Sequence, residues 1–238
     1  GKAIRMGHLA AVGSHSISGV SNFHTRLLAT RLLHNFHDLW PEKFNARTNG
    51  ITSRRWLFQA NPALAQLITE AIGDGWIRDL GELRKLEPLA DDSGFTDTWQ
   101  DVKRQNKVAL SDYAKRQWHM ELPPEMMYTI QATAIHPLKR HLLNILNIIA
   151  RHQRLQERPG GMPRAAIFCG KAAPGDHLGK LLVRLIHDVA AVLNNDARTS
   201  QYLRVLFMPN YRVSLAERVF PATDLSEHLA YAGLEPCG

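Results

Sequence analysis

Cysteine is scarce in this sequence, which contains only Cys169 and Cys237 among its 238 residues. Two cysteines cannot build a disulfide framework, and neither belongs to a Cys-x-x-Cys pair. The twelve histidines form no His-Glu-x-x-His motif and no cluster with metal-ligand spacing. These absences exclude a disulfide-stabilised secreted scaffold and predict no metal site. A reducing cytoplasm is the expected compartment.

Long apolar runs are also missing. No stretch approaches 18 consecutive apolar residues, so we predict no membrane span. Residues 1–6 lack the apolar core of a signal peptide. They also lack an initiator methionine, which indicates a stretch excised from a longer chain.

The chain carries an excess of positive charge, with a formal net charge of +7. This excess fits a solvated basic surface, a site for phosphate-bearing ligands, or a nucleic-acid interface. The basic residues are scattered, and the sequence contains no helix-turn-helix, zinc-finger or RNP motif. Nucleic acid is therefore the weakest of the three interpretations.

The first half of the sequence has helical patterns. Apolar residues recur at helical spacing over 20–36, which predicts one buried helical stripe that ends at Trp40-Pro41. Asn61-Pro62 has the form of a helix N-cap followed by proline at the first helical position. Residues 91–118 are charged and helix-favouring, and they predict a long exposed helix.

The second half changes to an alternating pattern. Apolar strand-like runs at 126–135, 165–169 and 202–208 alternate with helical patterns at 138–149 and 178–192. This alternation is typical of a parallel sheet with right-handed crossover helices. We therefore predict an α/β fold, with a parallel sheet and flanking helices, preceded by a helical segment.

Candidate ligand loops follow the strand-like runs. The segment from Gly170 to Gly175 is glycine-rich and leads into a helix, but it lacks the Lys-Ser/Thr of a P-loop. It suits a structural turn or a ligand loop, and both remain open. Lys139 follows the first predicted strand, and Tyr211-Arg212 follows the third. Taken by itself, each of these features can be interpreted as the solvent-exposed start of a helix. Two cations at one edge of one sheet favour an anion site.

Several longer sequence blocks are spread through the chain in a recognisable order. They are Gly13-Ser-His-Ser-Ile-Ser-Gly-Val20, Thr48-Asn-Gly-Ile-Thr52 with Arg54-Arg-Trp56, Asn61-Pro-Ala-Leu64, Gly170-Lys-Ala-Ala-Pro-Gly175, Asn210-Tyr-Arg-Val-Ser-Leu-Ala-Glu217 and Asp224-Leu-Ser-Glu227. In this order and at these spacings the blocks resemble the α-glucan phosphorylases, the family of glycogen, starch and maltodextrin phosphorylase. Because chains of that family are several times longer, the resemblance covers a central segment.

The resemblance implies a fold and an activity. Residues 1–48 would be the helical tail of an N-terminal domain, and 49–238 the first part of a C-terminal Rossmann-like domain in a two-domain glycosyltransferase fold. The implied reaction is phosphorolysis of α-1,4-glucan by inorganic phosphate to glucose 1-phosphate, with pyridoxal phosphate, in a cytoplasmic and typically homodimeric enzyme. The alternative is a non-catalytic remnant or accessory module that binds glucan or phosphate.

The resemblance also assigns roles to individual residues. Lys139, Arg212 and Glu235 are implied as catalytic groups, with Lys139 at the substrate phosphate. Tyr211, Arg212 and Gly238 are implied at the cofactor. The sugar would be bound by Asn49, Glu235 and Cys237.

The sequence departs from the family pattern close to these positions. Where the family reads Lys-Arg-Ile-His-Glu-Tyr-Lys-Arg, this chain reads Thr133-Ala-Ile-His-Pro-Leu-Lys-Arg140. Two cations are lost, one of them a phosphate-binding arginine at position 134, and Leu138 replaces a tyrosine near the sugar. Cys237 stands where a sugar-binding serine is usual. The lysine that forms the family's Schiff base would lie beyond Gly238, so we expect impaired or absent activity in this chain.

Overall fold

The structure is a computed structural model that describes residues 4–48, 51–231 and 233–234. The chain divides into two compact units. The larger unit is Thr52–Leu229, and the smaller unit contains the described residues of Gly1–Ile51 and Ala230–Gly238. Mixed α/β architecture with parallel strands and flanking helices confirms the predicted fold class.

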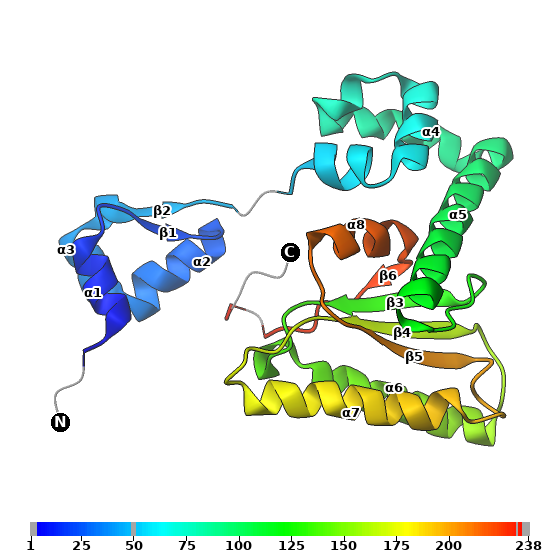
Figure 1. Cartoon of the computed structure of the whole chain (residues 1–238). Coiled ribbons are helices and arrows are strands. Elements are labelled where there is room, and N and C mark those ends of the chain that lie inside the picture. The colour runs from blue at the N-terminus through cyan, green and yellow to red at the C-terminus, as the bar shows by residue number, and fades with distance from the viewer. Residues whose placement is uncertain (1–3, 49–50, 232, 235–238) are drawn as a thin grey trace. The chain divides into compact units, whose positions relative to one another are not determined.

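The smaller unit is built from short elements (Figure 1). They are α1 (Met6–Gly13), β1 (Ile17–Gly19), α2 (Asn22–Leu27), α3 (His34–Leu39) and β2 (Phe44–Ala46). The two strands pair in parallel from Ile17↔Phe44 to Gly19↔Ala46. Sequence analysis missed both strands, because three residues are too few to display a two-residue alternation.

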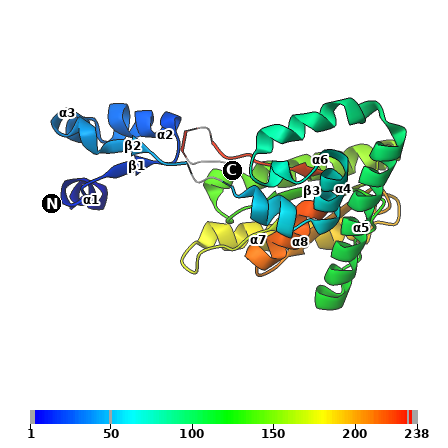
Figure 2. The same cartoon turned by 90° about the horizontal axis from the view of Figure 1, so that it is seen from above.

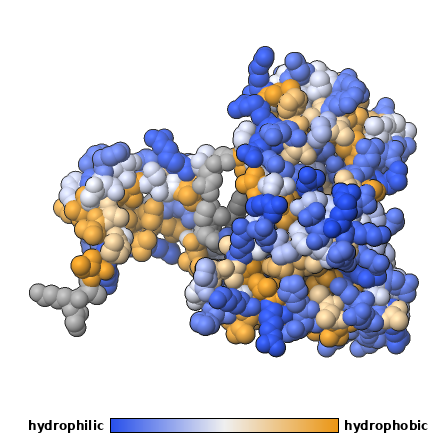
Figure 3. All heavy atoms as spheres, in the orientation of Figure 1, coloured by the Kyte–Doolittle hydropathy of each residue, from blue (hydrophilic) through white to orange (hydrophobic). Residues whose placement is uncertain are grey.

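Helical structure that ends before Trp40-Pro41 is confirmed, but the prediction of one buried helical stripe over 20–36 is wrong. A π-helix, Leu28–Leu32, separates α2 from α3. Leu33 is buried, but Phe23 and Leu32 are 54% and 69% exposed. Apolar residues accordingly gather on the visible face of this unit (Figure 3). Sequence periodicity identifies an apolar face of a helix. Burial of that face also needs a second element that packs against it. The described residues of this unit cover only part of the apolar face.

The larger unit begins with a helical segment. Its elements are a π-helix (Arg54–Gln59), α4 (Pro62–Ile72), two 3₁₀ helices (Gly75–Ile77 and Leu80–Asp91) and α5 (Ser93–Trp118). The side chain of Asn61 accepts a hydrogen bond from the backbone N–H of Leu64 at 3.4 Å, which confirms the predicted N-cap. The long α5 confirms the helix predicted over 91–118, but it is not wholly exposed, because Leu110 and Ala114 are buried in the core against the sheet. The fully buried Trp76 anchors a small core between these helices.

A four-stranded parallel sheet forms the rest of the larger unit. Its strands are β3 (Met127–Ala132), β4 (Arg164–Cys169), β5 (Leu203–Met208) and β6 (Leu225–Ser226), in the order β5-β4-β3-β6. The helices that follow β3, β4 and β5 are α6 (His141–Glu157), α7 (His177–Asn194) and α8 (Val213–Ala222). All three pairings are parallel, which confirms the predicted crossover topology. The two-residue β6 was not predicted.

The sheet is the middle layer of three. On β4, Ile167 and Cys169 enter the core shared with α5 and α8, whereas Ala166 and Phe168 enter the core shared with α6 and α7. Figures 1 and 2 show α8 and α5 on one face of the sheet, with α6 and α7 on the other. Because both faces are covered, the central strand is apolar at consecutive positions rather than at alternate ones.

The helices α6 and α7 differ in part from the helical patterns predicted over 138–149 and 178–192. The first, α6, begins at residue 141 rather than 138, because Pro137–Lys139 forms a 3₁₀ turn. On α7, Leu182 and Ile186 are buried, whereas Leu178 and Leu181, which belong to the apolar pattern over 178–192, are 52% and 60% exposed. Apolar residues occupy more than one face of this helix, and only the face against the sheet is covered.

Candidate functional site

The carboxyl edge of the larger sheet is the place where the predicted ligand loops meet. The loops 133–140, 170–176 and 209–212 follow β3, β4 and β5 respectively. Because these strands are parallel and adjacent, their loops emerge at one edge. The ends of β3 and β5 flank β4 and therefore lie about 10 Å apart, at the usual strand spacing.

The first two of these loops are fastened to each other by the backbone. The N–H of Thr133 donates to the carbonyl of Cys169 at 3.1 Å, and the N–H of Ile135 donates to that of Lys171 at 3.0 Å. A Cβ built on Gly170 would lie 2.3 Å from the carbonyl oxygen of Thr133. This glycine is therefore required for close backbone approach, which supports the structural-turn interpretation at that position.

The start of α7 is capped by the protein itself. The carboxylate of Asp176 accepts a hydrogen bond from the N–H of Gly179 at 2.8 Å. This donor is one that a helix N-terminus would otherwise offer to a bound anion. The N–H of Gly179, in the first turn of α7, is therefore not available to bind a phosphate.

Lys139 lies at the end of the 3₁₀ turn and is half-buried. Its carbonyl oxygen accepts a hydrogen bond from Gln131 Nε2 at 2.9 Å. The next residue, Arg140, has a left-handed backbone with φ of 54°, and its Nε donates to the carbonyl of Leu229. These contacts fix the backbone that carries Lys139 at the carboxyl edge.

A buried polar network lies beneath this turn. Asn144 Nδ2 donates to Gln131 Oε1 at 3.1 Å and also to the carboxylate of Glu227. The N–H of Glu227 donates to the carbonyl of Ile130 at 2.7 Å. The network joins β3, α6 and the end of β6, so it sets where the loop after β3 begins. Nothing in the sequence patterns identified it.

His141 is wholly buried at the first turn of α6. Its Nε2 lies 3.4 Å from the hydroxyl of Thr133, and its Nδ1 has no hydrogen-bond partner among the described residues. Burial lowers the pKa of His141 to about 4; interaction with the backbone of His136 opposes this shift, and the positive charge of Lys139 adds to it. The imidazole is therefore neutral at physiological pH.

Tyr211 and Arg212 follow β5. Tyr211 is half-buried against the core, where burial raises the pKa of its phenol and the neighbouring Cys169 adds to the increase. Arg212 is exposed; its Nε donates to Ser214 Oγ at 2.9 Å and its Nη1 to the carbonyl of Asn210 at 3.3 Å. The Tyr211 hydroxyl and the remaining N–H groups of Arg212 can donate hydrogen bonds to a phosphate group.

The structure thus places Lys139, Tyr211 and Arg212 at one edge of one sheet. The other predicted site residues, Asn49, Glu235, Cys237 and Gly238, lie outside the described residues. Within the described chain, no three His, Cys, Asp or Glu side chains gather as metal ligands. No helix of that part of the chain is long and apolar enough to cross a membrane.

Known proteins resemble the chain along its whole length. The model of the carbohydrate phosphorylase family matches residues 1–238. The chain is 44% identical over 239 residues to a glycogen phosphorylase of Synechocystis sp. and to the human liver form, and 43% identical to glycogen phosphorylase 2 of Dictyostelium discoideum. These alignments include 100% of the chain but 28%, 28% and 24% of the relatives.

Proposed function

The chain belongs to the carbohydrate phosphorylase family, and from this premise we propose that it is a segment of an enzyme that phosphorolyses α-1,4-glucan. The product is glucose 1-phosphate and the second substrate is inorganic phosphate. One observation carries the proposal: Lys139 and Arg212 follow parallel strands of the same sheet and lie at the same edge. Two cations there offset the charge of a bound phosphate and orient it towards the sugar.

The parent enzyme has two domains in this proposal. Residues 1–48 are the helical tail of its N-terminal domain, and 49–238 are the first part of its C-terminal Rossmann-like domain. The glycogen phosphorylases that match this chain support its being a segment of a longer enzyme, because the chain aligns with about a quarter of their length. The proposed parent is a cytoplasmic homodimer.

Pyridoxal phosphate is the proposed cofactor. Tyr211 and Arg212 would hold its phosphate, because a half-buried phenol and an exposed guanidinium supply hydrogen-bond donors at the carboxyl edge. When bound, the cofactor supplies a phosphate group that exchanges a proton with the substrate phosphate. Lys139 orients the substrate phosphate, while Asn49, Glu235 and Cys237 bind the sugar and Gly238 adjoins the cofactor.

The test measures phosphate binding and product formation together. We expect Lys139→Ala to weaken phosphate binding about 10- to 100-fold, the effect of one lost charge-assisted hydrogen bond. Nuclear magnetic resonance of the Gly170 amide reports binding at this edge, and glucose 1-phosphate is assayed with glucan, phosphate and pyridoxal phosphate. Lys115→Ala, which removes an exposed lysine in the last turn of α5, is the matched control. Equal weakening in both variants would contradict the proposal.

A non-catalytic glucan- or phosphate-binding module is the second candidate. Thr133 and Ala134 favour it, because they stand where the resembling family has a lysine and a phosphate-binding arginine. Formation of glucose 1-phosphate by the chain alone excludes this candidate. Binding of glucan or phosphate without product supports it, and absence of any binding contradicts both candidates.

Restoring a lost cation gives a further prediction. Ala134 is exposed in the loop after β3, so Ala134→Arg places a guanidinium at the carboxyl edge without displacing core atoms. We expect phosphate to bind about tenfold more tightly, as measured by calorimetry. Ala191→Arg, at an exposed position of α7, adds the same charge elsewhere. If it tightens binding equally, net charge rather than position is responsible.

A further inference from the structure

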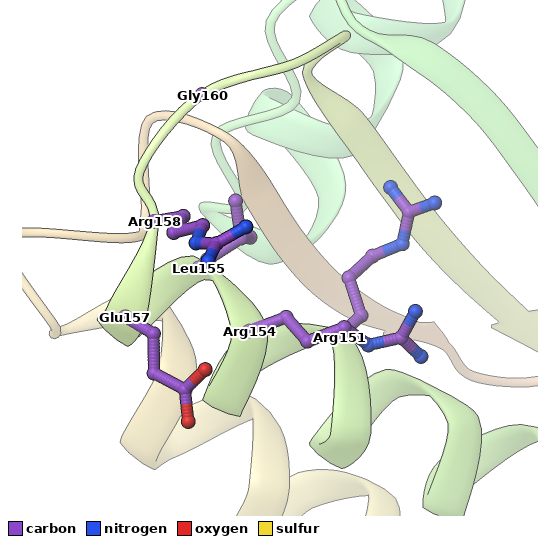
Figure 4. A pocket seen from close by; sticks show the side chains of 6 residues that line it. All are labelled: Arg151, Arg154, Leu155, Glu157, Arg158 and Gly160. Atoms are coloured by element: carbon purple, nitrogen blue, oxygen red, sulfur yellow. The ribbon is translucent and has the colours of Figure 1, made fainter.

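A second basic feature lies at the opposite, amino edge of the same sheet. It is a hollow of about 510 Å³, open to solvent, between the last turn of α6 and the turn that leads into β4 (Figure 4). This volume is within the range that holds small-molecule ligands. We call it the arginine hollow, and the residues that line it are Arg151, Arg154, Leu155, Glu157, Arg158 and Gly160.

The protein neutralises the positive charge of the arginine hollow only in part, because three arginines line it beside one glutamate. Glu157 is the only acidic side chain among the described residues of the lining, and its carboxylate points away from the guanidinium group of Arg151 (Figure 4). In the described part of the chain, no ion pair reaches Arg151, Arg154 or Arg158. Arg154 Nε has only a weak contact, 3.3 Å to the carbonyl of Ala150.

A fourth arginine stands beside the lining. Arg164 is the first residue of β4, and its buried Nε has no hydrogen-bond partner among the described residues. Burial lowers the pKa of Arg151, and the charges of Arg164 and Arg154 lower it further. Mutual repulsion of this kind is relieved when a bound anion brings negative charge between the guanidinium groups.

We propose that the arginine hollow binds a small molecule that carries a phosphate group. Guanidinium groups hold phosphate oxygens with paired hydrogen bonds, and two of these side chains, Arg154 and Arg158, are exposed and accessible. The hollow is larger than a phosphate ion requires and has room for a sugar. The described residues of its lining include no aromatic side chain on which a nucleobase would stack. A phosphorylated sugar or free phosphate therefore fits better than a nucleotide.

The experiment measures ligand binding at the two edges of the sheet separately, in the full chain. Inorganic phosphate, mannose 6-phosphate and mannose are titrated while amide resonances are followed. The Gly160 and Gly161 amides report the arginine hollow, and the Gly170 amide reports the carboxyl edge. We expect Gly160 and Gly161 to shift with both phosphates, saturating below about 10 mM, and to be unaffected by mannose. Tighter binding of mannose 6-phosphate identifies a sugar phosphate as the ligand class, and equal binding identifies phosphate alone.

Charge-matched variants decide whether the arginines are responsible. Arg151→Gln and Arg158→Gln are each expected to weaken this binding about tenfold or more. Arg184→Gln on α7, which removes a 79% exposed guanidinium paired with Asp188, is expected to change nothing. If thermal denaturation shows that the Arg151→Gln variant does not fold, the Arg158→Gln variant still provides the test, because Arg158 is exposed. Absence of a Gly160 shift, or equal losses in all three variants, overturns the proposal whatever the carboxyl edge does.

Discussion

Gly170→Ala is expected to destabilise the larger unit by about 3 kcal/mol or more, the upper part of the range for overpacked positions. The added Cβ would lie 2.3 Å from the carbonyl oxygen of Thr133 and 2.7 Å from Ile135 Cδ1. The first of these atoms belongs to the backbone, so relief requires the loops after β3 and β4 to separate. Separation stretches the hydrogen bond from Thr133 to Cys169 that joins them. Urea unfolding measured by circular dichroism gives the change in free energy.

The same loop provides a matched control for this substitution. A Cβ on Gly175 would meet no atom within 4 Å, and this glycine has no positive φ. Gly175→Ala is therefore expected to be neutral or to stabilise by up to about 1 kcal/mol, because it restricts the unfolded chain. If the two substitutions destabilise equally, the loss comes from loop flexibility rather than from the close contact with Thr133.

The central sheet was predictable because its strands are buried on both faces. In β4 every residue from Ala165 to Cys169 is buried, so the sequence shows an unbroken apolar run between a helix and a glycine. Such runs are separated by helical segments, and this order specifies parallel pairing. Edge elements lack that signal: the two residues of β6 are exposed and join the sheet only through backbone pairing.

The extent of burial on the helices was less predictable. Leu178 and Leu181 have helical spacing and apolar side chains, yet they face away from the sheet and are exposed. Sequence periodicity records which side chains share a face. It does not record which of two apolar faces another element covers, and that depends on how the helix packs against its sheet.

The candidate site was predictable only in part. Lys139 and Arg212 were placed at one edge because strand order fixes where parallel strands end. The Gln131–Asn144–Glu227 network was missed, since polar residues in a sequence suggest exposure. Their burial depends on partners brought together from three separate elements. The positions of Asn49 and Glu235 relative to this edge remain predictions.

Acid is expected to destabilise the fold through His141, and the pH window follows from its pKa. The imidazole has a pKa near 6.5 when the chain is unfolded, whereas burial lowers the folded value to about 4. Above pH 6.5 both states are neutral at this position and it contributes nothing to the pH dependence. Between pH 6.5 and 4 only the unfolded state takes up the proton, so stability falls as the pH falls. The total loss is about 3 kcal/mol, and it levels off below pH 4, where the folded state is protonated too.

Two histidine variants isolate this contribution. His141→Gln keeps a polar side chain within reach of the Thr133 hydroxyl but removes the titrating group. We expect its free energy of unfolding, measured in urea at each pH, to fall about 3 kcal/mol less than that of the parent chain between pH 6.5 and 4. His177→Gln, at an exposed position on α7, should retain the parent profile. Parallel profiles for the parent and His141→Gln would show that the buried imidazole is protonated without cost, which its complete burial argues against.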